Sequence, residues 1–116
     1  MDSSESDRQL IERLLTEYAS IPYADEPMLQ TQTIFDRLND HYILMNVGWE
    51  EREGVKQRLH YPLIHIDYIN GKFWIQHDGT DLGVAHELVE AGIPKSRIVL
   101  AFRAPELRQY TEYAVE

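Results

Sequence analysis

The sequence predicts an α+β fold, an antiparallel four-stranded meander with an N-terminal helix, a second helix after the sheet and a short further strand near the C-terminus. Three observations predict it. Apolar residues recur at three- and four-residue steps over residues 7–19 and 81–91, which is typical of amphipathic helices. Between them, β-branched and aromatic residues dominate residues 30–77, and turn dipeptides divide that stretch. At 116 residues the chain has the length of one domain, which we expect to span residues 1–116.

The N-terminal helix is predicted from a single apolar stripe, which consists of Leu10, Ile11, Leu14, Leu15 and Tyr18. Pro22 ends it, because a residue that precedes proline is pushed out of the α-helical backbone region. Residues 20–29 are then expected to form a linker.

The four strands are placed by three turn dipeptides, Asn39-Asp40, Glu53-Gly54 and Asn70-Gly71. The last is the clearest, because a two-residue type I′ loop needs positive φ at both positions and Asn-Gly adopts it readily. The strands beside it are predicted at residues 59–69 and 72–77, and the earlier pair at residues 31–38 and 41–49.

The tight loop sets which residues face each other across the last two strands. Asp67 is expected to face Trp74, and His65 to face Gln76. One side of this hairpin is the predicted core, formed by Ile64, Ile66, Tyr68, Phe73, Ile75 and His77. The other side is a candidate polar contact surface, formed by His65, Asp67, Trp74 and Gln76.

The first pair of strands is apolar on both sides. Ile34, Ile43, Met45, Val47 and Trp49 on one side oppose Phe35, Tyr42 and Leu44 on the other. A sheet with two apolar sides needs two covering layers, and another subunit can supply one of them. We therefore expect a homo-oligomer.

The second helix is predicted at residues 81–91, with Asp81 near its positive end. Gly92 can end it in the left-handed conformation, and Pro94 prevents its continuation. Residues 98–102 form an apolar run without polar alternation, which favours a short strand covered on both faces.

Composition excludes several classes of function. The chain has no cysteine, which excludes disulfides, thiolate zinc sites and cysteine nucleophiles. The net charge is −9 and acids outnumber bases in both halves, so direct DNA binding is disfavoured. Neither a signal peptide nor a membrane span is visible, and we expect a cytoplasmic protein.

The densest acidic group, Glu50, Glu51 and Glu53, is expected in a solvated loop whose acids pair with Arg52, Lys56 and Arg58.

Two clusters of polar side chains are candidates for a metal site or a ligand-binding site. His65 and Asp67 point to one side of a strand, and His60, His77 and Asp78 could approach them. A metal site needs three or four converging ligands and only two are certain here, so we predict an ordinary half-solvated sheet surface with no metal and no cofactor.

The second cluster, His77, Asp78, Gly79 and Thr80, forms the turn into the second helix. Backbone donors there can bind a small ligand, although a glycine and a threonine also suit a purely structural turn. No serine-hydrolase elbow, phosphate loop, dinucleotide fingerprint or metalloprotease helix is present, and no catalytic residue is assigned.

Four stretches in order resemble the XisI family. They are LLTEYA at residues 14–19, DHYILMNVGW at 40–49, GKFWIQHDGT at 71–80, and GIP at 92–94 followed by IVLAF at 98–102. With Pro105, Arg108, Tyr110 and Thr111, the resemblance covers residues 7–115. It implies a cyanobacterial accessory factor, not an enzyme, that controls programmed excision of a DNA element during heterocyst differentiation. The implied partners are a site-specific recombinase and a companion protein, XisH.

Two other hypotheses stay open at this point. One is a metal-dependent nuclease or hydrolase subunit that uses His65, Asp67 and His77. The other is a small-ligand sensor that binds at the turn formed by residues 76–80. The acidic charge favours the accessory-factor hypothesis over both, because an acidic chain suits a basic protein partner.

Overall fold

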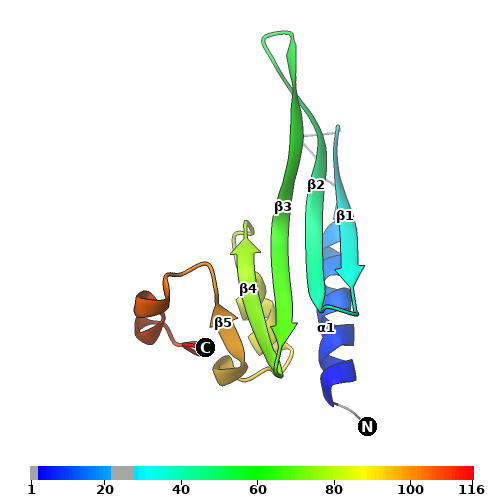
Figure 1. Ribbon diagram of the computed structural model, residues 1–116. Helices are drawn as coiled ribbons and strands as arrows, with labels where there is room; N and C mark the ends of the chain where they lie inside the picture. Colours follow the sequence, from blue (N-terminus) through cyan, green and yellow to red (C-terminus); the bar gives the residue numbers. More distant parts are fainter. Residues whose placement is uncertain (1–2, 22–27) are drawn as a thin grey trace.

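The computed structural model describes residues 3–21 and 28–116. Its elements follow the order α1 (Ser3–Ala19), β1 (Leu29–Asp36), β2 (His41–Arg52), β3 (Val55–Ile69), β4 (Lys72–Asp78), α2 (Val84–Glu90) and β5 (Ile98–Leu100), with short 3-10 helices at Lys95–Arg97 and Pro105–Tyr110. The strands form one sheet in sequence order, antiparallel from β1 to β4, and β5 joins β4 in parallel (Figure 1). The predicted α+β fold is confirmed. Pro22, expected to end α1, lies outside the described residues.

The three turn dipeptides lie where they were predicted. Asn70 and Gly71 have φ of 50° and 78°, as a type I′ loop requires. Glu53 and Gly54 also have positive φ, and so does Asp40. The meander therefore follows directly from local turn chemistry.

The core lies between one face of the sheet and the two helices. Ile11, Leu14 and Leu15 of α1 and Val84 and Leu88 of α2 are buried against it. The sheet contributes alternate residues, namely Tyr42, Leu44, Ile64, Ile66, Tyr68, Phe73 and Ile75. These include every core residue predicted from the last hairpin except His77.

His77 is exposed, and its assignment to the core was wrong. Ile69 pairs with Lys72 and Asp67 with Trp74 as expected, but a β-bulge between His65 and Ile66 shifts the register. His65 therefore pairs with His77 rather than with Gln76. An extra residue in one strand breaks the simple alternation on which the prediction depended.

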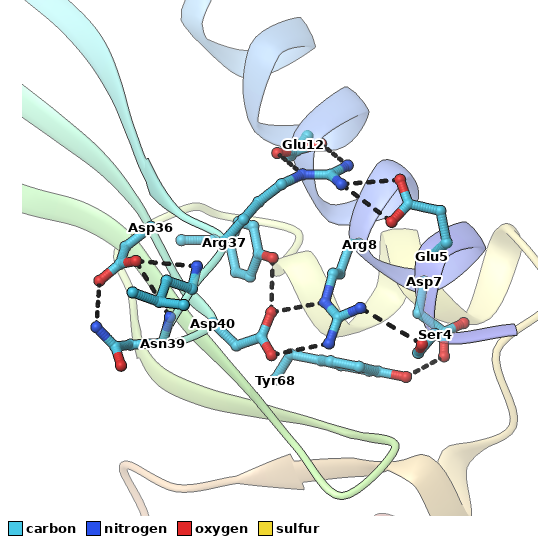
Figure 2. A network of polar contacts seen from close by, with 12 residues as sticks. Ser4, Glu5, Asp7, Arg8, Glu12, Asp36, Arg37, Asn39, Asp40 and Tyr68 are labelled. Carbon is cyan, nitrogen blue, oxygen red and sulfur yellow. Dashed lines mark hydrogen bonds and ion pairs between the residues drawn. The ribbon is translucent and has the colours of Figure 1, made fainter. Parts of the chain in front are cut away.

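Salt bridges attach α1 to the turn between β1 and β2 (Figure 2). The Arg8 guanidinium donates from Nε to Asp40 Oδ1 at 2.8 Å and from Nη2 to Asp40 Oδ2 at 3.1 Å. Arg37 bridges Glu5 and Glu12 on the helix. The hydrogen bond from Arg8 lowers the pKa of Asp40, so the pair stays charged at neutral pH. This network fixes the backbone immediately before β2.

Helix α2 begins at Val84, three residues later than predicted. Asp78, at the end of β4, accepts the Val84 N–H at 2.6 Å and so satisfies a free donor of the first turn. The end of the helix is as predicted: Gly92 has a φ of 103°, and the Ile93 N–H donates to Leu88 O at 3.0 Å.

Strands β2 and β3 extend beyond their neighbours as a two-stranded projection, residues 50–58, which we call the arm (Figure 1). It lengthens the molecule to 50 Å, and the radius of gyration is 15.5 Å, whereas about 13 Å is typical of a compact domain of roughly 100 residues. Glu50 and Glu51 belong to β2, so the expectation of a loop there was wrong. Within the described residues, no helix has the length and apolar character to cross a membrane.

Candidate functional site

The sheet surface opposite the helices, which we call the open face, holds the candidate site. In β2, the residues Tyr42, Leu44 and Asn46 are buried on the helix side, so the intervening residues point the other way. The open face consists of Gln30, Gln32, Ile34 and Asp36 from β1, His41, Ile43, Met45, Val47 and Trp49 from β2, Arg58, His60, Pro62, His65 and Asp67 from β3, and Trp74 and Gln76 from β4.

Part of the open face is an apolar band, formed by Ile43, Met45, Val47 and Trp49 along β2 with Ile34 of β1 beside Ile43. Ile34 and Trp49 are 46% and 45% exposed, and Ile34 lies directly opposite Ile43 in the register. The guanidinium of Arg58 lies over the Trp49 ring at 5.0 Å. Ile43, Met45 and Val47, which lie between Ile34 and Trp49, are half-buried. A contiguous apolar strip of this kind marks a surface that contacts other molecules.

The polar end of the open face is a cluster around Asp67. His41 Nδ1 lies 2.6 Å from Asp67 Oδ1, and His65 Nε2 lies 2.8 Å from the same oxygen. Gln76 Nε2 donates to the other oxygen, Oδ2, at 3.2 Å. The Asp67 side chain is 14% exposed, whereas that of His41 is 49% exposed. The Asp67 carboxylate is therefore largely sheltered from solvent, whereas the His41 imidazole is accessible to it.

The contacts with Asp67 determine which nitrogens of His41 and His65 carry a proton. The hydrogen bond to Asp67 raises the pKa of His41, and the Coulomb fields of Asp67, Asp36 and Asp40 add to the rise. An ionised carboxylate can only accept hydrogen bonds, so both imidazole nitrogens beside Asp67 carry a proton in this arrangement. Asp36 is the cross-strand partner of His41 on its other side, which places carboxylates on both neighbouring strands.

The structure brings together all four residues of the predicted polar surface and adds His41, which the sequence analysis missed. Counting back from the Glu53-Gly54 turn pairs Met45 with Pro62 and would pair His41 with Ile66. A bulge between Leu44 and Met45 pairs His41 with Asp67 instead. Pro62 lies at this bulge, and it is the sequence signal that could have located the shift, because proline within a sheet is confined to edge strands, strand starts and bulges. A one-residue shift moves a side chain to the opposite face.

His41, His65 and Asp67 form a group whose potential ligand atoms all lie within 4.8 Å of one another, the only such group in the described part of the chain. The nuclease hypothesis used His65, Asp67 and His77. The first two are together, but the third member of the group is His41.

Trp74 is covered by the C-terminal segment. The Arg108 guanidinium lies over its ring at 5.6 Å and also donates to Ala101 O at 3.2 Å. Ala114 forms a bridge with Val99 of β5, which holds the segment against the sheet edge. The indole is therefore half-buried within the chain rather than presented as a stacking platform.

The second candidate cluster, His77 to Thr80, bonds largely to itself. Asp78 Oδ1 accepts the N–H of Thr80 at 2.9 Å and its hydroxyl at 2.6 Å. The Gly79 N–H donates to Leu63 O at 2.8 Å. Because Asp78 Oδ2 accepts the Val84 N–H, the carboxylate occupies the place at the α2 N-terminus that an anionic ligand would take.

Comparison with known proteins gives a consistent result. The family model described as XisI protein matches residues 1–115. A XisI-like protein from Anabaena variabilis ATCC 29413 is 41% identical, with a TM-score of 0.84 over 96% of this chain and 97% of that chain. The fdxN element excision controlling factor XisI of the same organism is 28% identical, with a TM-score of 0.81 over 99% and 100% of the two chains. A comparison with curated proteins found no match. With matching motifs, matching fold and a family model over nearly its whole length, the chain belongs to the XisI family.

Proposed function

We propose that the protein is a non-catalytic accessory factor that controls programmed site-specific excision of a DNA element, and that it acts in the cytoplasm through contacts with other proteins. Family membership supports the first part, because a relative that aligns over the whole chain is named for control of fdxN element excision. The observation that carries the second part is the apolar band of the open face, exposed on a chain with a net charge of −9.

The partner we propose is an XisH-like companion, with a site-specific recombinase contacted directly or through it. An apolar band with a half-exposed tryptophan suits the centre of a protein interface, where aromatic anchors supply most of the binding energy. The acidic charge favours a basic partner by electrostatic steering and disfavours the phosphate backbone of DNA.

The basic residues of the arm do not change this balance. Arg52 Nη2 lies 2.6 Å from Glu50 Oε1, and Lys56 is the cross-strand partner of Glu51. Arg58 lies over the ring of Trp49. A basic side chain already paired with an acid or an aromatic ring contributes less to phosphate binding, because that pairing is lost on transfer.

The open face also supports a homo-oligomer, because a second copy of the chain can cover the same apolar band. The helices already cover the other face, so a facing pair of sheets would bury the remaining apolar side chains of β1 and β2. Size-exclusion chromatography with light scattering measures this state directly.

The test is co-purification of the tagged chain with an XisH-like companion at low salt. Ile34→Glu places a charge in the apolar band, and Leu82→Glu is the matched control, because Leu82 is 75% exposed in the segment between β4 and α2. We expect Ile34→Glu to reduce companion affinity by about tenfold or more, as loss of an interface centre does, and Leu82→Glu to leave it unchanged. Unchanged thermal unfolding of both variants confirms that they are folded.

Three outcomes would contradict the proposal. The first is no association of the wild-type chain with the companion at low salt. The second is equal loss in both variants, which would make added charge rather than the open face responsible. The third is cleavage of DNA by the purified chain in magnesium or manganese, which would show an enzyme.

A further inference from the structure

We propose that His41, His65 and Asp67 bind a divalent transition-metal ion such as Zn²⁺, with the remaining coordination positions open to the solvent side of the open face. Each residue offers one ligand atom, and these atoms lie within 4.8 Å of one another. Two imidazole nitrogens and one carboxylate oxygen form a ligand set suited to zinc and to its neighbours in the first transition row.

The scaffold holds these ligands in nearly the required positions. His41 on β2 and Asp67 on β3 are direct cross-strand partners, and His65 lies two residues before Asp67 on the same side of β3. In a tetrahedral zinc site, bonds of about 2.0–2.1 Å put neighbouring ligand atoms about 3.3 Å apart. The two nitrogens now lie 2.6 Å and 2.8 Å from Asp67 Oδ1, so each separation must grow by less than about 1 Å for an ion to enter.

The surroundings support an ion at this point. The Gln76 amide donates to Asp67 Oδ2 at 3.2 Å and so orients the carboxylate with Oδ1 toward the two rings. Partners that orient a ligand in this way are a regular part of metal sites. The His41 and His65 side chains are 49% and 30% exposed, which leaves a path for the ion from solvent.

Charge also favours a cation here. Asp67 contributes a negative charge within the cluster, and Asp36 lies across from His41 on β1. When the ion binds, the proton on His41 Nδ1 and the proton on His65 Nε2 pass to solvent, and the freed lone pairs coordinate the metal. When no ion is bound, hydrogen bonds from the two imidazoles to Asp67 Oδ1 hold the three side chains together.

The test uses the purified full chain at mildly alkaline pH, titrated with Co²⁺ as a spectroscopic probe and then with Zn²⁺. Isothermal titration calorimetry should give one bound ion per chain, and bound cobalt should show visible absorption bands that zinc abolishes by displacement. Zinc should also raise the thermal unfolding midpoint, because a ligand that binds the folded state stabilises it.

Variants assign the site. His41→Gln, His65→Gln and Asp67→Asn should each abolish the cobalt bands and the thermal shift. Gln76→Leu should weaken binding by about 10- to 100-fold, as loss of an orienting partner does. His77→Gln and His86→Gln are the matched controls, because both remove an exposed imidazole outside the group, and both should bind cobalt like the wild type.

The proposal is overturned if the wild type binds neither ion, or if His41→Gln and His65→Gln bind cobalt with unchanged spectra and affinity. It is also overturned if His77→Gln abolishes binding, because the ion would then lie elsewhere on the sheet. The circular dichroism spectrum of each variant confirms that it is folded. The site is independent of the proposed function, and loss of one leaves the other standing.

Discussion

At the scale of single residues, a few aspartates organise the molecule by accepting several hydrogen bonds each. Asp7 is only 5% exposed, and it accepts from the Tyr68 hydroxyl and from the Arg97 guanidinium. Asp67 does the same for two imidazoles on the open face. A buried carboxylate is tolerated only when such donors replace the water it has lost.

The hydrogen bond between the Tyr68 hydroxyl and Asp7 makes the free energy of unfolding fall at alkaline pH. Burial, followed by the hydrogen bond to Asp7, raises the pKa of Tyr68 from 10.0 to about 12. A raised folded-state pKa means that the contribution is complete below pH 10 and is lost as the pH rises toward 12. Tyr68→Phe should therefore show a smaller fall in the free energy of unfolding across this range, measured by urea denaturation at several pH values.

Tyr110→Phe is the control for this measurement, because the Tyr110 side chain is 80% exposed. It should keep the wild-type fall. Burial also raises the pKa of Tyr42, so Tyr68→Phe should keep part of the fall rather than none. Parallel curves for wild type and Tyr68→Phe would show that the Tyr68 hydroxyl does not titrate differently in the folded and unfolded states.

At the scale of elements, two bulges and one glycine decide where the strands place their side chains. The bulges shift the register of β3 against both its neighbours, which joins His41 to the cluster and leaves His77 outside it. Gly48 lies where β2 meets the start of β1, and Leu29 is its cross-strand partner. Here the backbones approach too closely for any larger residue.

Gly48→Ala should destabilise the sheet. A Cβ atom at this position would lie 2.1 Å from Met28 O and 2.8 Å from the Leu29 Cα, and both are backbone atoms that cannot rotate away. Leu29 is buried, so displacing the start of β1 also disturbs packing. We expect a loss of about 1–3 kcal/mol in the free energy of unfolding, as overpacking typically costs, measured by chemical denaturation.

Gly79→Ala is the matched control, because its nearest contact would be the flexible end of the Leu63 side chain at 3.3 Å. It should cost clearly less. If Gly48→Ala were as stable as Gly79→Ala, then the start of β1 would have to move away from β2 without loss of packing, which contradicts the close approach described above.

At the scale of the whole molecule, the fold is one-sided. Both helices cover one face of the sheet, whereas among residues 3–21 and 28–116 only the C-terminal segment lies on the other face, at its β4–β5 edge (Figure 1). The arm extends the sheet past its helices, and the chain carries a net charge of −9. This combination favours binding of another protein through the apolar band, while the acidic charge attracts a basic partner from a longer distance.

Salt separates the two kinds of association proposed for the open face. Raising the salt concentration from about 0.05 M to about 0.5 M shortens the screening length several-fold and should weaken binding of a basic XisH-like companion by about tenfold or more. Self-association through the apolar band should change much less, because burial of apolar surface is not screened. Analytical ultracentrifugation at both concentrations measures both equilibria, and a companion complex insensitive to salt would contradict electrostatic steering.

Much of the candidate site could be predicted from the sequence, and the part that could not has a specific cause. His65, Asp67, Trp74 and Gln76 were grouped correctly, because alternation along a strand depends only on local spacing. His41 was missed because its pairing depends on a bulge between Leu44 and Met45, opposite Pro62 and Ile64 of β3. The cover over Trp74 was missed because Arg108 reaches it from a C-terminal segment without a periodic pattern.

By itself, the sequence determined the family, the order of the elements, the turns that define the meander and the end of α2, because motifs, turn dipeptides and helix stop signals act over a few residues. Only the tertiary structure decided which side of the first strand pair is the core and that His41 meets His65 at Asp67. Those facts depend on register, and register is the sum of turns, bulges and packing over the whole sheet, so one inserted residue changes which side chains meet.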